Sequence, residues 1–328
     1  MNNFSYTLAA QPDEALRERT GPGRAAYLAG GTNLIDHIKL GVEQPQRLVD
    51  VRKLGLDRIE ALPGGGLRIG ATVRNTTLAY DERVLKNYPV LSQAILSGAS
   101  PQLRNAATTA GNLLQRTRCS YFRDGLSPCN KRQPGSGCAA LGGFHRTHAL
   151  FGTSERCIAT HPSDMDVAMI ALDAVVRLRG TRGERTVPLH DFYVAYGEDP
   201  AKENVLEPGE LITAVDLPAT GWFARSHYFK ARDRASYEFA LSSAAVALDL
   251  RDGRVRDCRI ALGGVATKPW RAHAVENALK GTRPNAQTFH AAAEAELRAA
   301  VPRAHNGFKI ELCRATLVQA LLTTAALA

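Results

Sequence analysis

The chain has 328 residues, of which 45% are hydrophobic and 22% are charged, an ordinary globular composition and long enough for two domains. No run of 18 apolar residues occurs and the first residues do not resemble a signal peptide, so we expect neither membrane insertion nor a targeting segment. The formal net charge is +9, but no nucleic-acid-binding motif accompanies it, so nucleic acid is not an expected partner.

The first third is expected to mix strands and helices. A short strand ending at Tyr27 and Leu28 leads into the glycine segment Ala29–Asn33, and apolar residues at helical spacing then predict a helix over 34–40. The following pattern predicts strands at 47–51, 56–62 and 66–73 and helices at 75–97 and 104–115.

Residues 116–159 have no clear period and are rich in Gly, Pro, Ser, Arg and Cys. A structureless segment of this length is improbable in a compact domain unless something holds it. Between Pro101 and Thr160 lie eight Lys or Arg residues and only two acids. A free loop with this charge would repel itself, so we expect it to face an acidic partner surface through Lys131 and Arg132; a solvent-facing insertion is the alternative.

Regular structure is expected to resume with a helix at 163–172 and strands at 174–179 and 211–217, ending at a composition break over 218–221. Beyond that break, the pattern predicts strands at 227–231, 240–250 and 254–263, with an Asp252-Gly253 turn between the last two. Helices are predicted at 270–280 and 287–301 and from 306 to the end.

Two segments suit close approach to a phosphate. In Ala29-Gly30-Gly31-Thr32-Asn33, adjacent glycines let backbone N–H groups approach an anion, although a plain strand–turn–helix would also use them. In Leu103–Leu114, Thr108 and Thr109 can donate hydrogen bonds beside Gly111 and Asn112, although small residues also serve tight helix packing. Together the two segments favour a flavin or nucleotide site.

Two further residues have open interpretations. Asp164 follows Ser163 at the start of a helix, where it either complements the helix end or accepts a hydrogen bond from a ligand hydroxyl. Lys230, by itself, is expected to be a solvated strand lysine.

Four of the six cysteines, Cys119, Cys129, Cys138 and Cys157, fall within the basic segment. Their spacing fits neither a zinc ribbon nor the bacterial ferredoxin run, but four thiolates are what a 4Fe–4S cluster requires, and the basic setting would offset its negative charge. A structural zinc ion or two disulfides are the alternatives. Cys258 and Cys313 stand apart and are expected to be buried structural thiols.

Five segments resemble, in the same order, the FAD-binding subunits of the xanthine dehydrogenase and aldehyde oxidoreductase family: LAGGTNLIDHIK, RNAATTAGNLL, PSDM, FKARDRASYEFA and ALGGVATKPWRA. The resemblance implies an α+β fold. A two-part FAD-binding domain like that of vanillyl-alcohol oxidase would span 1–218, with a 4Fe–4S insertion at about 116–160. A domain like the C-terminal one of carbon monoxide dehydrogenase flavoproteins would span 222–328.

The resemblance also implies the cofactor residues. The pyrophosphate of FAD would lie against Ala26, Tyr27, Leu28, Ala29, Gly30, Gly31, Thr32, Asn33 and Leu34. Thr108, Gly111, Asn112 and Leu114 would form the second wall, and Asp164, Ile212 and Lys230 would line the isoalloxazine and ribityl side. The insertion resembles that of periplasmic aldehyde oxidoreductases, so its four cysteines would ligate the cluster. No catalytic residue is assigned to this chain.

The function implied is an oxidoreductase subunit that relays electrons. A large molybdopterin-binding subunit would oxidise an aldehyde, a small subunit with 2Fe–2S clusters would pass the electrons on, and FAD here would deliver them to an external acceptor. The heterotrimer is expected in the periplasm, co-exported with a signal-bearing partner, or else in the cytoplasm. The alternative functions are a stand-alone flavin reductase of the UDP-N-acetylenolpyruvoylglucosamine type and a non-catalytic iron–sulfur scaffold.

Overall fold

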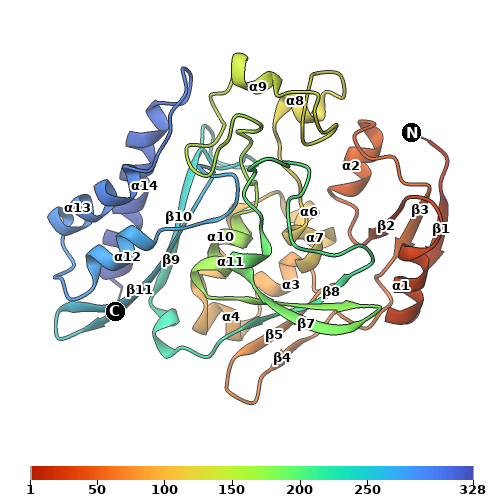
Figure 1. Ribbon diagram of the computed structural model, residues 1–328. Coiled ribbons are helices and arrows are strands. Elements are labelled where there is room, and N and C mark those ends of the chain that lie inside the picture. The colour runs from red at the N-terminus through yellow and green to blue at the C-terminus, as the bar shows by residue number, and fades with distance from the viewer. Residues whose placement is uncertain (1, 328) are drawn as a thin grey trace.

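The computed structural model describes residues 2–327. The chain begins with a small parallel sheet in the order β1-β3-β2, formed by β1 (Ser5–Leu8), β2 (Ala25–Leu28) and β3 (Arg47–Asp50) (Figure 1). Helix α1 (Pro12–Thr20) buries Ala15 and Leu16 against it, together with Val49 and Val51. Helix α2 (Leu34–Lys39) follows the glycine segment.

An antiparallel sheet of five strands forms the second part, in the order β4-β5-β8-β6-β7. Its strands are β4 (Ile59–Ala61), β5 (Leu67–Gly70), β6 (Val175–Gly180), β7 (Gly183–Pro188) and β8 (Leu211–Leu217). The helices of this part are α3 (Asn75–Ala79), α4 (Glu82–Asn87), α5 (Pro89–Ser97), α6 (Pro101–Ala106), α7 (Thr109–Leu113), α10 (Asp164–Ala171) and α11 (Leu189–Phe192). Apolar residues of α5 and α10 join those of the sheet in the largest core.

The C-terminal part contains an antiparallel sheet in the order β12-β11-β10-β9, followed by three helices. The strands are β9 (Ser226–Ala231), β10 (Ser242–Arg251), β11 (Arg254–Gly263) and β12 (Trp270–Arg271), and a 3-10 turn at Gly221–Ala224 precedes them. The helices are α12 (His273–Leu279), α13 (Ala286–Leu297) and α14 (Phe308–Ala325).

This sheet is buried on both faces, which is why β10 reads as a nearly continuous apolar run. Alternate residues point to opposite faces. Ala245 and Ala247 belong to the core shared with α5 and α10, whereas Ala244, Val246 and Leu248 belong to the core shared with α12, α13 and α14.

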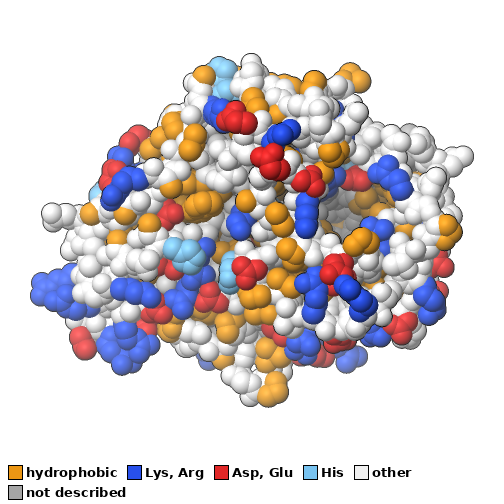
Figure 2. All heavy atoms as spheres, viewed as in Figure 1, with side chains coloured by type: hydrophobic (Ala, Val, Ile, Leu, Met, Phe, Trp, Pro, Cys, Tyr) orange, Lys and Arg blue, Asp and Glu red, His pale blue; other side chains and the backbone are white. Residues whose placement is uncertain are grey.

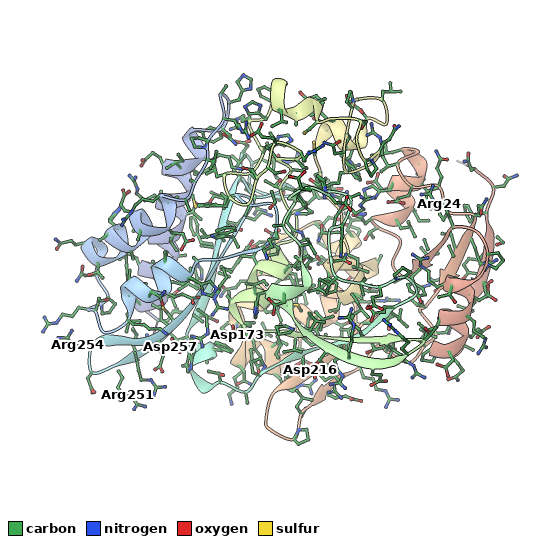
Figure 3. The ribbon with its side chains drawn as sticks, in the orientation of Figure 1. Arg24, Asp173, Asp216, Arg251, Arg254 and Asp257 are labelled. Carbon is green, nitrogen blue, oxygen red and sulfur yellow. The ribbon has the colours of Figure 1, made fainter. Side chains whose placement is uncertain are left out.

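Salt bridges also join the part that contains the five-stranded sheet to the C-terminal part. Asp173, just after α10, accepts from Arg259 of β11 at 2.7 Å and from Arg271 of β12 at 2.6 Å. Arg259 also pairs with Asp257 at 2.8 Å, and Figure 3 shows Asp173 and Asp257 at the junction of the two parts.

Two predicted helices are broken in the structure. The segment 75–97 forms α3, α4 and α5, because the Asp81 side chain caps α4 by accepting from Arg83 N and Pro89 begins α5. The segment 104–115 forms α6 and α7, because Thr108 has an extended backbone and caps α7. The pattern at 270–280 begins with strand β12, which pairs with β11, before α12.

Residues 116–159 are largely irregular, as predicted, and contain only the short helices α8 (Ser120–Arg123) and α9 (Ala139–Gly142). They form a layer over one end of the molecule, at the top of Figure 1. Within residues 2–327, no helix is both long enough and apolar enough to cross a bilayer.

Candidate functional site

Two neighbouring cavities meet at the segment before α2 and at α7. We call the one beside β2 and β8, of about 540 Å³, the N-terminal cavity, and the one beside α5 and α10, of about 530 Å³, the central cavity. Thr32, Asn33 and Gly111 line both. Each has the volume typical of a small-molecule site, about 300–1,000 Å³, and Figure 2 shows this face of the molecule hollowed.

The glycine segment is placed by contact with the second wall. A Cβ added to Gly30 would lie 2.0 Å from the carbonyl oxygen of Ala106, so only glycine lets the two segments meet. Gly31 has φ +73°, a left-handed conformation that other residues rarely adopt. The loop therefore depends on both glycines for different reasons.

Most of the predicted FAD-binding residues reach these cavities. Of the pyrophosphate set, all but Leu28 line the N-terminal cavity: Ala26, Tyr27, Ala29, Gly30, Gly31, Thr32, Asn33 and Leu34. Thr108 and Leu114 line the same cavity, whereas Asn112 lines the central one. Leu28 lies in β2, and its carbonyl accepts a hydrogen bond from Val51 N.

One residue of the second wall, Thr109, does not have the ligand-facing position that the sequence suggested. Thr109 is fully buried and donates to the Val73 carbonyl at 3.1 Å, so it faces the protein rather than a ligand. Thr108 Oγ accepts from Gly111 N at 3.3 Å, which leaves its hydroxyl proton free to donate. Asn112 accepts from Ser163 Oγ at 2.8 Å and so ties α7 to α10.

Asp164 and Lys230 form a buried ion pair in the wall of the central cavity. Lys230 Nζ lies 2.8 Å from Asp164, and their side chains are only 3% and 8% exposed, so the expectation of a solvated lysine is wrong. Tyr228 Oη donates to the other Asp164 oxygen at 2.6 Å, and burial, followed by the Asp164 charge, raises the pKa of Tyr228 well above its ordinary value. Both carboxylate oxygens therefore already have protein donors.

Ile212 does not lie with Asp164 and Lys230. It lines the N-terminal cavity, beside Gly209 and Leu211. The three residues grouped by resemblance are therefore divided between the two cavities, because β8 runs beside the N-terminal part of the molecule whereas α10 and β9 border the central cavity.

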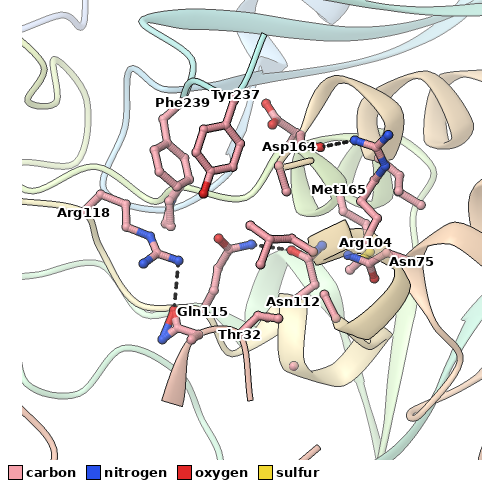
Figure 4. A pocket seen from close by; sticks show the side chains of 18 of the residues that line it. Thr32, Asn75, Arg104, Asn112, Gln115, Arg118, Asp164, Met165, Tyr237 and Phe239 are labelled. Carbon is pink, nitrogen blue, oxygen red and sulfur yellow. Dashed lines mark hydrogen bonds between the residues drawn. The ribbon is translucent and has the colours of Figure 1, made fainter. Parts of the chain in front are cut away.

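Several residues of the central cavity were not singled out in the sequence. Figure 4 shows Arg104, Arg118, Tyr237 and Phe239 around it. Arg118 donates to Asn33 at 3.2 Å, and its guanidinium lies 5.2 Å from the centre of the Phe239 ring. Tyr237 and Phe239 lie within the segment FKARDRASYEFA, whose family resemblance could have pointed to them. Arg118 was considered only as one of the charges of the basic insertion.

The four clustered cysteines, Cys119, Cys129, Cys138 and Cys157, surround one small cavity in the insertion. Cys129 and Cys138 face each other across an antiparallel bridge. Burial raises the pKa of Cys119 to about 11 and that of Cys157 to about 12, so neither would be a thiolate at neutral pH without a bound cation. Cys258 and Cys313 are fully buried elsewhere, in β11 and α14.

The six cysteines are all free, so the disulfide alternative gains no support from the structure. In the part of the chain that the structure describes, no three His, Cys, Asp or Glu side chains come close enough together to hold a single metal ion.

The charge of the insertion is balanced within the chain. All seven of its Lys and Arg residues have an acidic partner, in the pairs Arg116–Glu43, Arg118–Asp36, Arg123–Asp36, Lys131–Glu203, Arg132–Asp124, Arg146–Asp233 and Arg156–Glu198. The charge of the insertion therefore does not require an acidic partner surface, and its docking on a partner stays a prediction. Lys131 cannot serve as docking surface, because its side chain is 1% exposed and lies 3.6 Å from the centre of the Tyr196 ring.

Glu203 is the centre of the buried part of this network. It lies 3.1 Å from Lys131 Nζ and 2.8 Å from Arg116. Although burial acts in the opposite direction, Lys131 and Arg116 hold the pKa of Glu203 below its ordinary value. The carboxylate thus fixes the insertion to the loop before β8.

We expect Glu203→Gln to destabilise the protein by about 3 kcal/mol, because it leaves the buried Lys131 charge without its counterion. Thermal and denaturant unfolding would measure the change. Glu198→Gln is the matched control. The Glu198 side chain is 89% exposed and that of its partner Arg156 is 53% exposed, so the loss of stability should stay below about 1 kcal/mol. Equal costs for the two variants would contradict this account.

Two family models of known proteins together match almost the whole chain. Residues 2–220 match the FAD binding domain in molybdopterin dehydrogenase, and residues 227–324 match the CO dehydrogenase flavoprotein C-terminal domain. The chain is 54% identical to the aldehyde oxidoreductase FAD-binding subunit PaoB of Escherichia coli K12, over 98% of each chain. It is 27% identical to the glyceraldehyde dehydrogenase medium chain of Sulfolobus acidocaldarius, over 86% of this chain and 83% of the relative.

Solved structures share the fold. Quinoline 2-oxidoreductase from Pseudomonas putida 86 superimposes with a TM-score of 0.77 at 24% identity, covering 99% of this chain and 97% of that one. Reconstituted CO dehydrogenase from Oligotropha carboxidovorans gives 0.78 at 24% identity, covering 100% and 99%. These matches confirm the predicted α+β fold class, and the chain belongs to the family of FAD-binding oxidoreductase subunits of the molybdenum hydroxylases.

Proposed function

We propose that this chain is the electron-transferring subunit of a heterotrimeric, molybdenum-containing aldehyde oxidoreductase, and that it holds FAD across its two cavities and a 4Fe–4S cluster among its four clustered cysteines. The observation that carries the proposal is the arrangement of the two sites along the chain. Arg118 lines the central cavity and the next residue, Cys119, lines the cysteine cavity.

The cavities fit FAD in shape and in polar groups. They join at Thr32, Asn33 and Gly111, so an elongated ligand can extend through both. Thr72 Oγ1 in the N-terminal cavity and Asn75 Oδ1 in the central cavity are buried without a protein hydrogen-bond partner. Buried polar atoms of this kind are usually satisfied by a ligand or water.

The cysteine cavity fits an iron–sulfur cluster in its donor set. Four thiols converge on one small space, and a cluster core separates its ligand sulfurs more widely than a single ion does. The nearby cations are held in place, with Lys131 and Arg116 both fixed by Glu203. When bound, the cluster would supply one-electron transfer and FAD two-electron transfer.

The chain's own part in the relay is to hold the two sites close together. Neighbouring Cα atoms lie about 3.8 Å apart, so the segment from Arg118 to Cys119 is a short connection between them. Partner subunits with molybdopterin and 2Fe–2S clusters, an external electron acceptor and co-export to the periplasm complete the proposal. Its support is the 54% identity to a subunit named for aldehyde oxidoreductase.

Gly31→Val should abolish FAD binding, because a β-branched residue cannot adopt φ +73° readily and its Cβ would lie 3.1 Å from Ile35. Flavin absorbance per chain, measured after acid release, provides the test. Gly41→Val is the matched control: it has φ +74°, no atom within 4 Å of an added Cβ, and no part in either cavity. A folded Gly31→Val chain with full FAD would refute the assignment.

Cys129→Ser should remove iron while leaving FAD bound, since it deletes one thiolate ligand without touching the flavin cavities. Iron, zinc and flavin analysis of anaerobically prepared protein would show the loss. Cys258→Ser, which removes a buried thiol in β11, should keep both cofactors. Wild-type protein that contains zinc, or no metal, would overturn the cluster.

The assembled complex should oxidise aldehydes with an artificial electron acceptor, whereas the purified chain alone should not, because the proposed oxidation occurs on the molybdenum-bearing partner. A complex carrying Gly31→Val should lose reduction of acceptors that react at FAD. Aldehyde turnover by the single chain would contradict the proposal.

A further inference from the structure

A buried histidine contacts one of the four clustered cysteines. His148 is 4% exposed, and its Nε2 lies 3.2 Å from Cys119 Sγ. We propose that His148 is a positioning residue that donates an N–H···S hydrogen bond to Cys119 and thereby sets the reduction potential of the 4Fe–4S cluster. This inference rests on the proposed function.

The direction of the hydrogen bond follows from the chemistry of the two groups. A cysteine sulfur bound to iron carries no proton, so the contact is attractive only when Nε2 carries one. The other ring nitrogen, Nδ1, is buried and has no hydrogen-bond partner in the described chain. The Cys119 contact is therefore the polar interaction that this ring makes.

The backbone of His148 is held by the C-terminal part of the molecule. Lys309 of α14 is fully buried, and its Nζ donates to the carbonyls of His148, Thr147 and Gly264 at 2.9, 3.2 and 2.6 Å. Asn306 donates to the carbonyl of Ala149 at 3.2 Å. These donors fix the backbone of the segment that carries the imidazole, so the Cα of His148 cannot move away from Cys119 without breaking buried hydrogen bonds.

Cys119 is well placed for such control, because its neighbour Arg118 lines the central cavity. Hydrogen bonds to ligand sulfurs stabilise the more negative, reduced form of a cluster and so raise its reduction potential. The His148 bond would therefore favour movement of an electron onto the cluster.

His148→Phe keeps an aromatic ring but removes the donor. In the full-length chain with its cofactors, the ratio of reduced to oxidised cluster at a fixed potential should fall about tenfold, the effect of one ordinary hydrogen bond. For a one-electron couple, this is a shift of about 59 mV to lower potential, measured by redox titration monitored by electron paramagnetic resonance. His148→Gln, which retains an N–H donor, should recover part of the shift.

His145→Phe is the matched control. His145 is also buried and lies in the same loop, but its ring nitrogens bond the Ala140 carbonyl and the His305 amide. This variant should lose stability without changing the potential. An unchanged potential in His148→Phe with full iron would overturn the role of His148 and leave the proposed function standing, whereas iron-free wild-type protein would overturn both that role and the proposed cluster.

A second measurement covers the case in which His148→Phe fails to assemble its cluster. In wild-type protein labelled with ¹⁵N-histidine, pulsed electron paramagnetic resonance of the reduced cluster should detect magnetic coupling to an imidazole nitrogen. Absence of that coupling would overturn the hydrogen bond.

Discussion

The glycine segment and the end of α6 meet where a side chain has no room. Because a Cβ at position 30 would lie 2.0 Å from the Ala106 carbonyl, the loop after β2 can lie directly against the end of α6. That approach sets the N-terminal sheet beside α7 and creates the pair of cavities on either side of Thr32, Asn33 and Gly111. The rest of the site is arranged around this contact.

The charged groups in the wall of the central cavity are already paired by the protein. The Asp164–Lys230 pair and Tyr228 form a closed buried unit, and Ser163 bonds Asn112 across α7 and α10. Buried charges are tolerated when paired in this way, and removing one partner is costly. The site is therefore preorganised, and a ligand need not displace its structural bonds to bind.

The charged residues of the insertion are likewise paired with residues of opposite charge. Its positive charge is matched by acids from α2, the loop before β8 and the loop after β9, so an irregular segment becomes a fixed layer. Lys309 and Asn306 hold it from the C-terminal side. The insertion, whose own residues line the cysteine cavity, is thus held in place by distant parts of the chain.

The sequence by itself determined the element types over most of the chain, the α+β class and the two glycine-bearing segments, because periodicity and glycine placement are local properties. It also predicted that the four clustered cysteines share one site, and all four line one small cavity. Helix breaks at Asp81, Pro89 and Thr108 were visible residue by residue but were outweighed by the apolar pattern around them.

Only the tertiary structure decided which side chains share a cavity or a counterion. Ile212 lies apart from Asp164, Thr109 faces the core, and Lys131 is buried against Glu203, 72 positions away in the chain. Pairing of charges distant in sequence depends on how the strands order themselves in the sheets, and a count of charges along the chain carries no information about that order. For the same reason, the contact from His148 to Cys119 appears only once the loop is folded.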